Sequence, residues 1–224
     1  NVPRSDQSFD EQLWVFARDT STGALDLVQV LEQGVNGVDG INSSGARITL
    51  SADGSTLFVG ASAGTSFGDR SIAAFTRDPT TGALTYRDRV AKSDGVGPLG
   101  VAVASLAAST NGQRVVSGQV GSSSPSITTS GPLVFDFDPV SGDLTYEGAL
   151  NLPGVPDDGV NALAFRSVSG GEALYVNATD VVAAFEHDAA SDGLAGFTLR
   201  QTLDETDGLV GTALGNEARS FAFD

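Results

Sequence analysis

The sequence predicts an all-β fold made of repeated four-stranded antiparallel sheets, and three observations support this prediction. A Phe-x-x-Asp-x-x-x-Gly-x-Leu motif occurs at 16–25, 75–84 and 135–144, with a degenerate copy at 185–194. Its period is about 60 residues, shortening to about 50 before the last copy, which is long enough for about four strands. Short alternating segments rich in β-branched and aromatic residues flank each copy, and no segment has helical periodicity.

Each copy of the motif predicts a β-hairpin. The strands that lead into it are expected at 13–16, 71–75, 132–135 and 181–185. We expect the motif Asp to bond its own backbone and the motif Gly to take a positive φ. A second hairpin lies between successive copies, at 48–59, 101–116 and 162–176. Each period is therefore predicted to be a meander of four strands, named a to d in order.

Sheets repeated in this way are typical of a β-propeller, because radial repetition leaves only short, protected edges. The blade repeats are expected near 9–31, 47–90, 99–150, 160–203 and 218–224, so residues 1–224 form a single β-propeller domain or a fragment of one. This gives about three complete blades plus a split or incomplete blade, with a last strand at 219–223. Three alternatives stay open: the native chain continues, one blade has three strands, or another copy completes the ring.

The composition excludes several classes of partner. The 224 residues carry 12 Lys and Arg against 28 Asp and Glu, a net charge of −16, while 40% of the residues are hydrophobic. A surface this acidic repels nucleic acid and anionic lipid headgroups, and the longest apolar run, 99–108, is too short to span a membrane. The absence of Cys excludes disulfides, thiolate metal sites and thiol nucleophiles.

The composition also suggests where the protein works. The chain contains a single Lys, and it begins with Asn and contains no Met, so we expect a processed product, a domain of something longer or an incomplete sequence. An acidic surface with little Lys suits a salty or calcium-containing exterior, where screening relieves self-repulsion. We therefore expect an extracellular or cell-surface location, with the periplasm as the alternative.

Two motifs resemble those of a known family. The Phe-x-Arg-Asp-x-x-Thr-Gly-Ala-Leu hairpins at 16–25 and 75–84, together with the segment LSADGSTLFV at 50–59, resemble the lactonase-type seven-bladed β-propellers, which include 6-phosphogluconolactonase-like enzymes. Related repeats are found in large secreted or surface bacterial proteins. The resemblance covers nearly the whole chain and implies a propeller fold. The motifs are turn motifs, and no catalytic position of the family is matched in this sequence.

A second repeated element lies in the loops that join one period to the next. An Asp-Gly pair followed by an aliphatic residue recurs there, and its four carboxylates are expected at one end of the sheets. Such a set could hold a hard cation such as Ca²⁺, with Asn36, Asp157 and Asn161 as further oxygen donors. The simpler interpretation, which the turn chemistry favours, is that Asp-Gly only turns the chain. The candidate metal ligands are Asp39, Asp94, Asp158 and Asp207.

His187 is the only imidazole in the chain. It takes the place that Arg18 and Arg77 hold in the equivalent hairpins, so it is expected on the tight-turn face, opposite the long loops. No nearby order of Ser and Asp suggests a catalytic triad. We expect an exposed turn residue rather than a general base, and no catalytic residue is assigned.

These observations favour an exported, non-catalytic propeller module for binding, adhesion or assembly. Its long Gly/Ser/Asp loops are expected to present a face to a protein or carbohydrate ligand, with Ca²⁺ as the candidate cofactor. Self-assembly, or a place in a larger chain, is also expected. The alternative function is a lactonase-type hydrolase of a small sugar lactone, and a third is a structural repeat of a surface fibre.

Overall fold

The computed structural model is an all-β chain in which every sheet is antiparallel. It describes residues 11–41, 47–61, 70–96, 99, 103–119, 131–153, 159–178, 181–204 and 207. The only helices in these ranges are short 3-10 turns, among them η1 (Lys92–Asp94) and η3 (Gly193–Gly196). The prediction of an all-β fold built from four-stranded antiparallel sheets is confirmed.

Four sheets follow one another along the chain, and each consists of strands adjacent in sequence. The first sheet has two strands, β1 (Gln12–Arg18) and β2 (Leu25–Glu32). The second contains β3 (Arg47–Leu50), β4 (Thr56–Ala61), β5 (Ser71–Arg77) and β6 (Leu84–Ala91). The third contains β7 (Val103–Ala108), β8 (Arg114–Gln119), β9 (Leu133–Phe137) and β10 (Leu144–Ala149). The fourth contains β11 (Val160–Val168), β12 (Gly171–Ala178), β13 (Val181–His187) and β14 (Phe197–Leu203). The strand expected at 219–223 lies outside the described residues.

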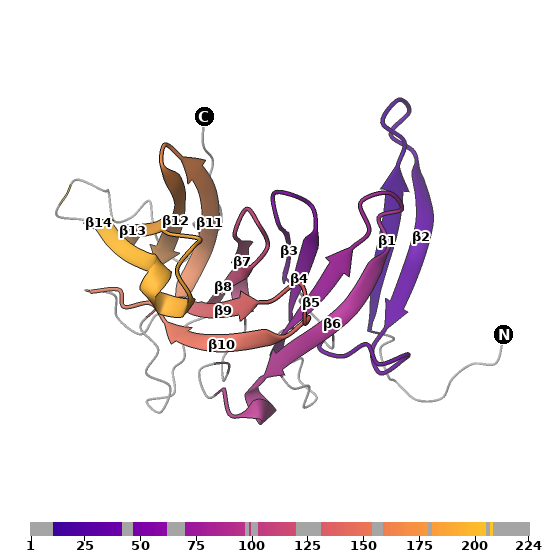
Figure 1. Ribbon diagram of the computed structural model, residues 1–224, viewed down its shortest axis with the longest axis horizontal. Helices are drawn as coiled ribbons and strands as arrows, with labels where there is room; N and C mark the ends of the chain where they lie inside the picture. Colours follow the sequence, from indigo (N-terminus) through magenta and orange to yellow (C-terminus); the bar gives the residue numbers. More distant parts are fainter. Residues whose placement is uncertain are drawn as a thin grey trace.

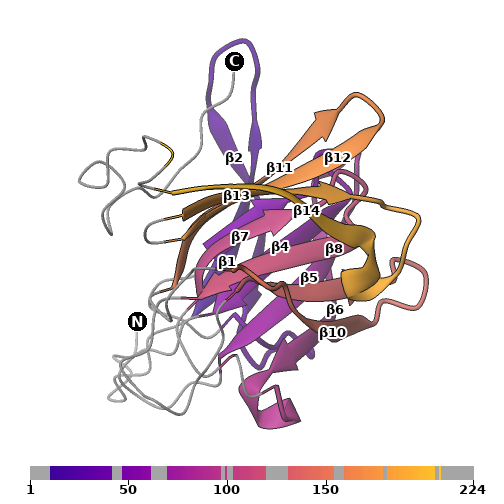
Figure 2. The ribbon, with the colours of Figure 1, turned by 90° about the vertical axis from the view of Figure 1, so that its left-hand side faces the viewer.

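The sheets stand side by side in chain order, from β1–β2 at one end of the row to β11–β14 at the other (Figure 1). Seen from the β11–β14 end, they lie one behind another (Figure 2). An apolar core fills each of the three junctions between consecutive sheets. This arrangement is propeller-like, with one two-stranded and three four-stranded sheets packed face to face.

The hairpin turns have the chemistry that the motif predicts. Asp19 Oδ1 accepts hydrogen bonds from the backbone N–H groups of Ser21 at 2.7 Å and Thr22 at 3.0 Å, and Asp78 does the same in the next copy. The Ser21 hydroxyl also donates to Asp19 Oδ1, and this bond together with the two backbone bonds lowers the pKa of Asp19 to about 2. Gly23, Gly82 and Gly142 all have positive φ. Several of these turns share one end of the molecule, which we call the turn end, and η1 lies at the other (Figure 1).

Candidate functional site

Two of the four predicted metal ligands lie together at the end opposite the turns. Arg89 of β6 binds both, with Nε 2.5 Å from Asp39 Oδ2 and Nη1 3.2 Å from Asp94 Oδ2. Gln33 Nε2 also donates to Asp39 Oδ1 at 2.6 Å. Burial raises the pKa of Asp39, but the hydrogen bonds from Gln33 and Arg89 outweigh it and the net pKa is lowered. A guanidinium therefore lies where these two carboxylates meet.

Of the other two predicted ligands, only Asp207 lies among the described residues. Asp158 lies outside the described residues, and Asp207 Oδ2 accepts a local hydrogen bond from the Asp204 backbone at 3.2 Å. Asp94 also accepts a bond from the backbone N–H of Ala91 at 2.8 Å, which closes the η1 turn. Within the described ranges, no three His, Cys, Asp or Glu side chains are placed to hold a metal ion. The calcium hypothesis stays a prediction.

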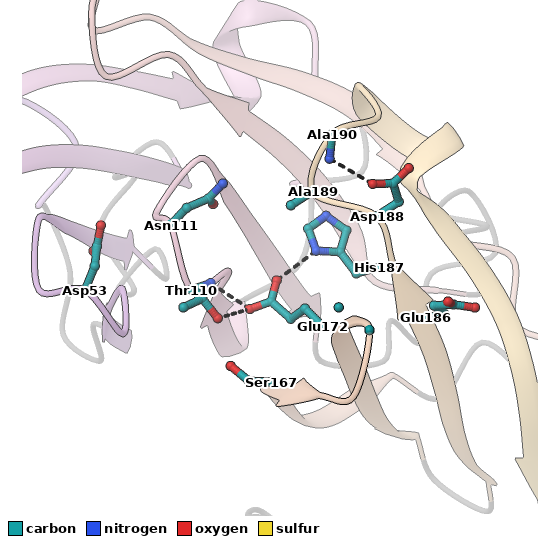
Figure 3. Close-up of a pocket in the computed structure, with 12 residues that line it drawn as sticks. Asp53, Thr110, Asn111, Ser167, Glu172, Glu186, His187, Asp188, Ala189 and Ala190 are labelled. Atoms are coloured by element: carbon teal, nitrogen blue, oxygen red, sulfur yellow. Dashed lines mark hydrogen bonds and ion pairs between the residues drawn. The ribbon is translucent and has the colours of Figure 1, made fainter.

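A cleft of about 790 Å³ opens at the turn end, where the last three sheets come together (Figure 3). It is formed by the β3–β4 turn, the β7–β8 turn and the two hairpin turns of the last sheet. Its polar lining consists of Asp53, Thr110, Asn111, Ser167, Glu172, Glu186, His187 and Asp188. This cleft thus lies on the tight-turn face, whereas the sequence predicts the binding face among the long loops.

A carboxylate and an imidazole form the inner wall of this cleft. Glu172 is the second residue of β12 and lies opposite His187 of β13 in the strand register, so both side chains point to the same face of the sheet. Glu172 Oε2 lies 2.8 Å from His187 Nδ1. Glu172 Oε1 accepts a bond of 2.7 Å from the backbone N–H of Thr110, and another from the Thr110 hydroxyl (Figure 3). The carboxylate therefore ties the fourth sheet to the third.

The expectation that His187 is an exposed turn residue is wrong, because the residue is only 1% exposed. Phe197 lies opposite it on β14, and the two rings stack with centroids 4.5 Å apart. Phe165 meets the imidazole edge-on at 5.4 Å. The two phenylalanine rings therefore cover His187, which stands at the position that Arg18 and Arg77 hold in the equivalent hairpins. His187 Nε2 is buried with no hydrogen-bond partner.

The surroundings of Glu172 favour its ionised form. Burial raises the pKa of this carboxyl group, but the hydrogen bonds from His187 and Thr110 together outweigh it, so the net pKa is lowered. Glu172 is therefore a fixed negative charge at neutral pH, although it is only 6% exposed. The arrangement orients the imidazole and leaves Nε2 as its one uncommitted polar atom.

Sequence reasoning missed Glu172 and Thr110. Glu172 follows the Ser-Gly-Gly turn of a predicted hairpin, and strand pairing with the next hairpin would have placed it opposite His187. Thr110 offers no such signal, because its contact with Glu172 joins two sheets across 62 residues of chain. The contact between Thr110 and Glu172 depends on how the third and fourth sheets stack, which local sequence rules do not predict.

Comparison with known proteins supports the fold. A candidate 6-phosphogluconolactonase from Bacteroides uniformis is similar with a TM-score of 0.56 and 16% identity, over 87% of this chain and 49% of that chain. A protein from Lactobacillus plantarum is similar with a TM-score of 0.52 and 19% identity, over 87% and 52%. This chain thus spans about half the length of these structures. At such identities the likeness shows a lactonase-like fold alone.

No family model and no curated protein sequence matches the chain. In the part of the chain that the structure describes, no helix is both long and apolar enough to cross a membrane.

Proposed function

We propose that this chain is an exported, non-catalytic binding module, and that its turn-end cleft takes a neutral polyhydroxylated ligand such as an oligosaccharide. The observation that carries the proposal is the polar lining of the cleft. Asp53, Glu186 and Asp188 supply acceptors for sugar hydroxyls, and Asn111 supplies both a donor and an acceptor. An ionised carboxylate can accept about four hydrogen bonds, so Glu186 and Asp188 retain capacity beyond their internal contacts with Arg200, Ala190 and Ser191. Asp53 already accepts from the Ser51 hydroxyl and from the backbone and hydroxyl of Ser55.

The charge of the chain supports the choice of a neutral ligand. With a net charge of −16 and acidic residues around the cleft, an anionic ligand would be repelled at long range. Hydroxyl groups carry no charge and make strong hydrogen bonds to carboxylates. The same acidic composition supports the proposed location outside the cell.

The burial of His187 supports binding rather than catalysis. Its side chain has no exposed surface, and its carboxylate partner is already bonded to Thr110. A general base must come within about 3 Å of the proton that it removes. In this conformation the imidazole is a buried part of the cleft wall.

Binding to the cleft is tested by isothermal titration with a panel of neutral di- to tetrasaccharides. Ser167→Tyr places a large side chain at the cleft, and Val140→Tyr is the matched control, because Val140 is 88% exposed and is not part of the lining. We expect Ser167→Tyr to lower the affinity of a binding sugar at least tenfold and Val140→Tyr to leave it unchanged. The proposal fails if no sugar in the panel binds, or if both variants behave alike.

The second candidate function is hydrolysis of a small sugar lactone. It is favoured by the Glu172–His187 pair, because His187 is among the residues that line the cleft and its buried Nε2 has no hydrogen-bond partner, and by the candidate lactonase among the similar structures. In this reaction Nε2 would take a proton from the water that attacks the lactone carbonyl. The ring C–O bond would then break, and the leaving oxygen would receive the proton.

A direct assay separates the two functions. Hydrolysis of glucono-δ-lactone is followed as acid release, for the unaltered chain and for His187→Phe. The binding proposal predicts the uncatalysed rate for both proteins. A rate above background that falls at least tenfold in His187→Phe would establish the hydrolase instead.

A further inference from the structure

One face of the β1–β2 sheet exposes large apolar side chains. Trp14 lies opposite Val30 in the strand register and Phe16 lies opposite Leu27, so these residues share a face. Trp14 is 53% exposed and Phe16 47%, and their rings are stacked with centroids 6.3 Å apart. Leu25 and Leu27 are also exposed. We call this surface the head face; its residues are Trp14, Phe16, Leu25, Leu27 and Val30.

The equivalent face of each later sheet is covered by the sheet that precedes it in the chain. Phe16 is the motif Phe of the first sheet, and its equivalents are Phe75, Phe135 and Phe185. These three are 0%, 0% and 3% exposed. Each is packed against the sheet that precedes it in the chain. Phe16 is the one motif Phe without a preceding sheet among the described residues.

The covering surface is the same in character at the first two junctions. The preceding sheet contributes the residues one and three positions before its own motif Phe: Leu13 and Val15 pack with Phe75, and Ile72 and Ala74 pack with Phe135. At the first junction a polar side chain of the preceding sheet also bonds the first residue of the next sheet's last strand. Gln29 binds both backbone groups of Leu84 at 2.8 and 3.0 Å.

The last sheet carries the matching surface with nothing described beyond it. Val182 and Ala184 are the residues three and one positions before Phe185, and both are partly exposed. Gln201 lies opposite Ala184 as Gln29 lies opposite Val15, and it is exposed. We call Val182, Ala184 and Gln201 the tail face. The two faces lie at opposite ends of the row of sheets (Figure 1).

We propose that a second copy of this chain docks its tail face on the head face. The contact would repeat a junction that the chain already forms three times within itself. Val182 and Ala184 would cover Phe16, and the Gln201 amide would bind the backbone of Leu25 as Gln29 binds that of Leu84. Such head-to-tail contacts close into rings or extend as filaments. This inference is independent of the ligand cleft.

The apolar content of the head face is enough to drive association. A buried aromatic side chain removes about 150–250 Å² from water, and two aromatic and several aliphatic side chains are half exposed on this face. Exposed apolar patches larger than a few hundred Å² mark interaction sites in soluble proteins. The second copy supplies a complementary apolar and amide surface from the same sequence.

The chain has no Cys, so head-to-tail contact can be trapped with introduced thiols. Leu27→Cys marks the head face and Val182→Cys marks the tail face. Treated with a short bismaleimide, a mixture of the two variants is expected to give at least five times more covalent dimer than either variant alone. Equal yields in all three samples, or a dimer of the head variant alone, would overturn the proposal.

Two measurements in the unmodified chain complete the test. Sedimentation velocity should show oligomers whose fraction rises with concentration, and emission of Trp14, the only Trp, should shift to the blue over the same range. Leu27→Glu should give monomer at concentrations where Val140→Glu, the control at a remote exposed site, still associates. A chain that stays monomeric up to about 1 mM, or whose emission is blue-shifted equally at all dilutions, contradicts the proposal.

Discussion

Replacing Glu172 tests the contact that ties the last two sheets together. The carboxylate accepts three hydrogen bonds, two from Thr110 and one from His187, and is almost fully buried. A hydrogen bond to a charged group contributes about 1.5–3 kcal/mol, and bonds that share one group are not additive. We therefore expect Glu172→Ala to lower the free energy of unfolding by about 3 kcal/mol. For a chain of this size that corresponds to roughly 6–12 °C in Tm.

The assay is thermal and urea unfolding followed by circular dichroism. Glu186→Gln is the matched control, because the Glu186–Arg200 ion pair is solvent-exposed and such pairs contribute less than about 1 kcal/mol. If Glu172→Ala changes the unfolding free energy by less than about 0.5 kcal/mol, the carboxylate does not hold the sheets together.

The same contact predicts a pH dependence. The pKa of Glu172 is lowered in the folded chain, so the unfolded chain binds more protons and stability rises with pH. The contribution of Glu172 is complete above the unfolded pKa of about 4.3 and is lost as the pH falls through the folded value. The difference in stability between the unaltered chain and Glu172→Gln should therefore be largest above about pH 5 and shrink towards pH 3.

Four further predictions follow from other contacts. Arg114→Met should lower the free energy of unfolding, measured in urea, by about 3–5 kcal/mol, because Arg114 is buried with Nε 3.0 Å from Asp136. The control Arg200→Met, which removes an exposed ion pair, should lower it by less than about 1 kcal/mol. Gly112→Ala should lower the free energy of unfolding by about 2 kcal/mol more than Gly23→Ala does. Both glycines have positive φ, but a Cβ at Gly112 would lie 2.7 Å from Thr56 Oγ1, whereas none of the described atoms would lie within 4 Å of a Cβ at Gly23. If Asp39, Asp94, Asp158 and Asp207 hold Ca²⁺, differential scanning calorimetry should give a higher Tm in millimolar Ca²⁺ than in chelator, and equal values would remove the site. Head-to-tail association should strengthen with added salt in sedimentation equilibrium, because screening weakens the repulsion between copies that each carry −16, and weaker association in salt would contradict an apolar contact.

Local chemistry explains what the sequence could predict. The Asp and Gly of each motif act within a few residues, so Asp19, Asp78 and their hairpins follow from turn preferences alone. The strands are equally local, since alternation and turn spacing set their bounds. The four-stranded sheets were therefore predictable from one repeat.

The site depended on packing between sheets, which no local rule supplies. His187 was expected in solvent because Arg holds its place in two other hairpins, and only the stacking of Phe197 and the pairing with Glu172 bury it. Arg89 of β6 binds Asp39 and Asp94, which lie 50 and 5 residues away in the chain, and no local pattern joins all three. A charged side chain finds its partner in three dimensions, and spacing alone did not reveal these pairs.

Successive sheets stack face to face, so that the turn end of the last sheet closes on the preceding one around His187. Because this is the only imidazole in the chain, its ring signals can be assigned directly by NMR. This packing predicts a slowly exchanging Nδ1 proton bonded to Glu172, with NOEs from the ring to Phe165 and Phe197 and from Glu172 to Thr110. A ring whose N–H protons exchange freely with water and that shows none of these NOEs would contradict it.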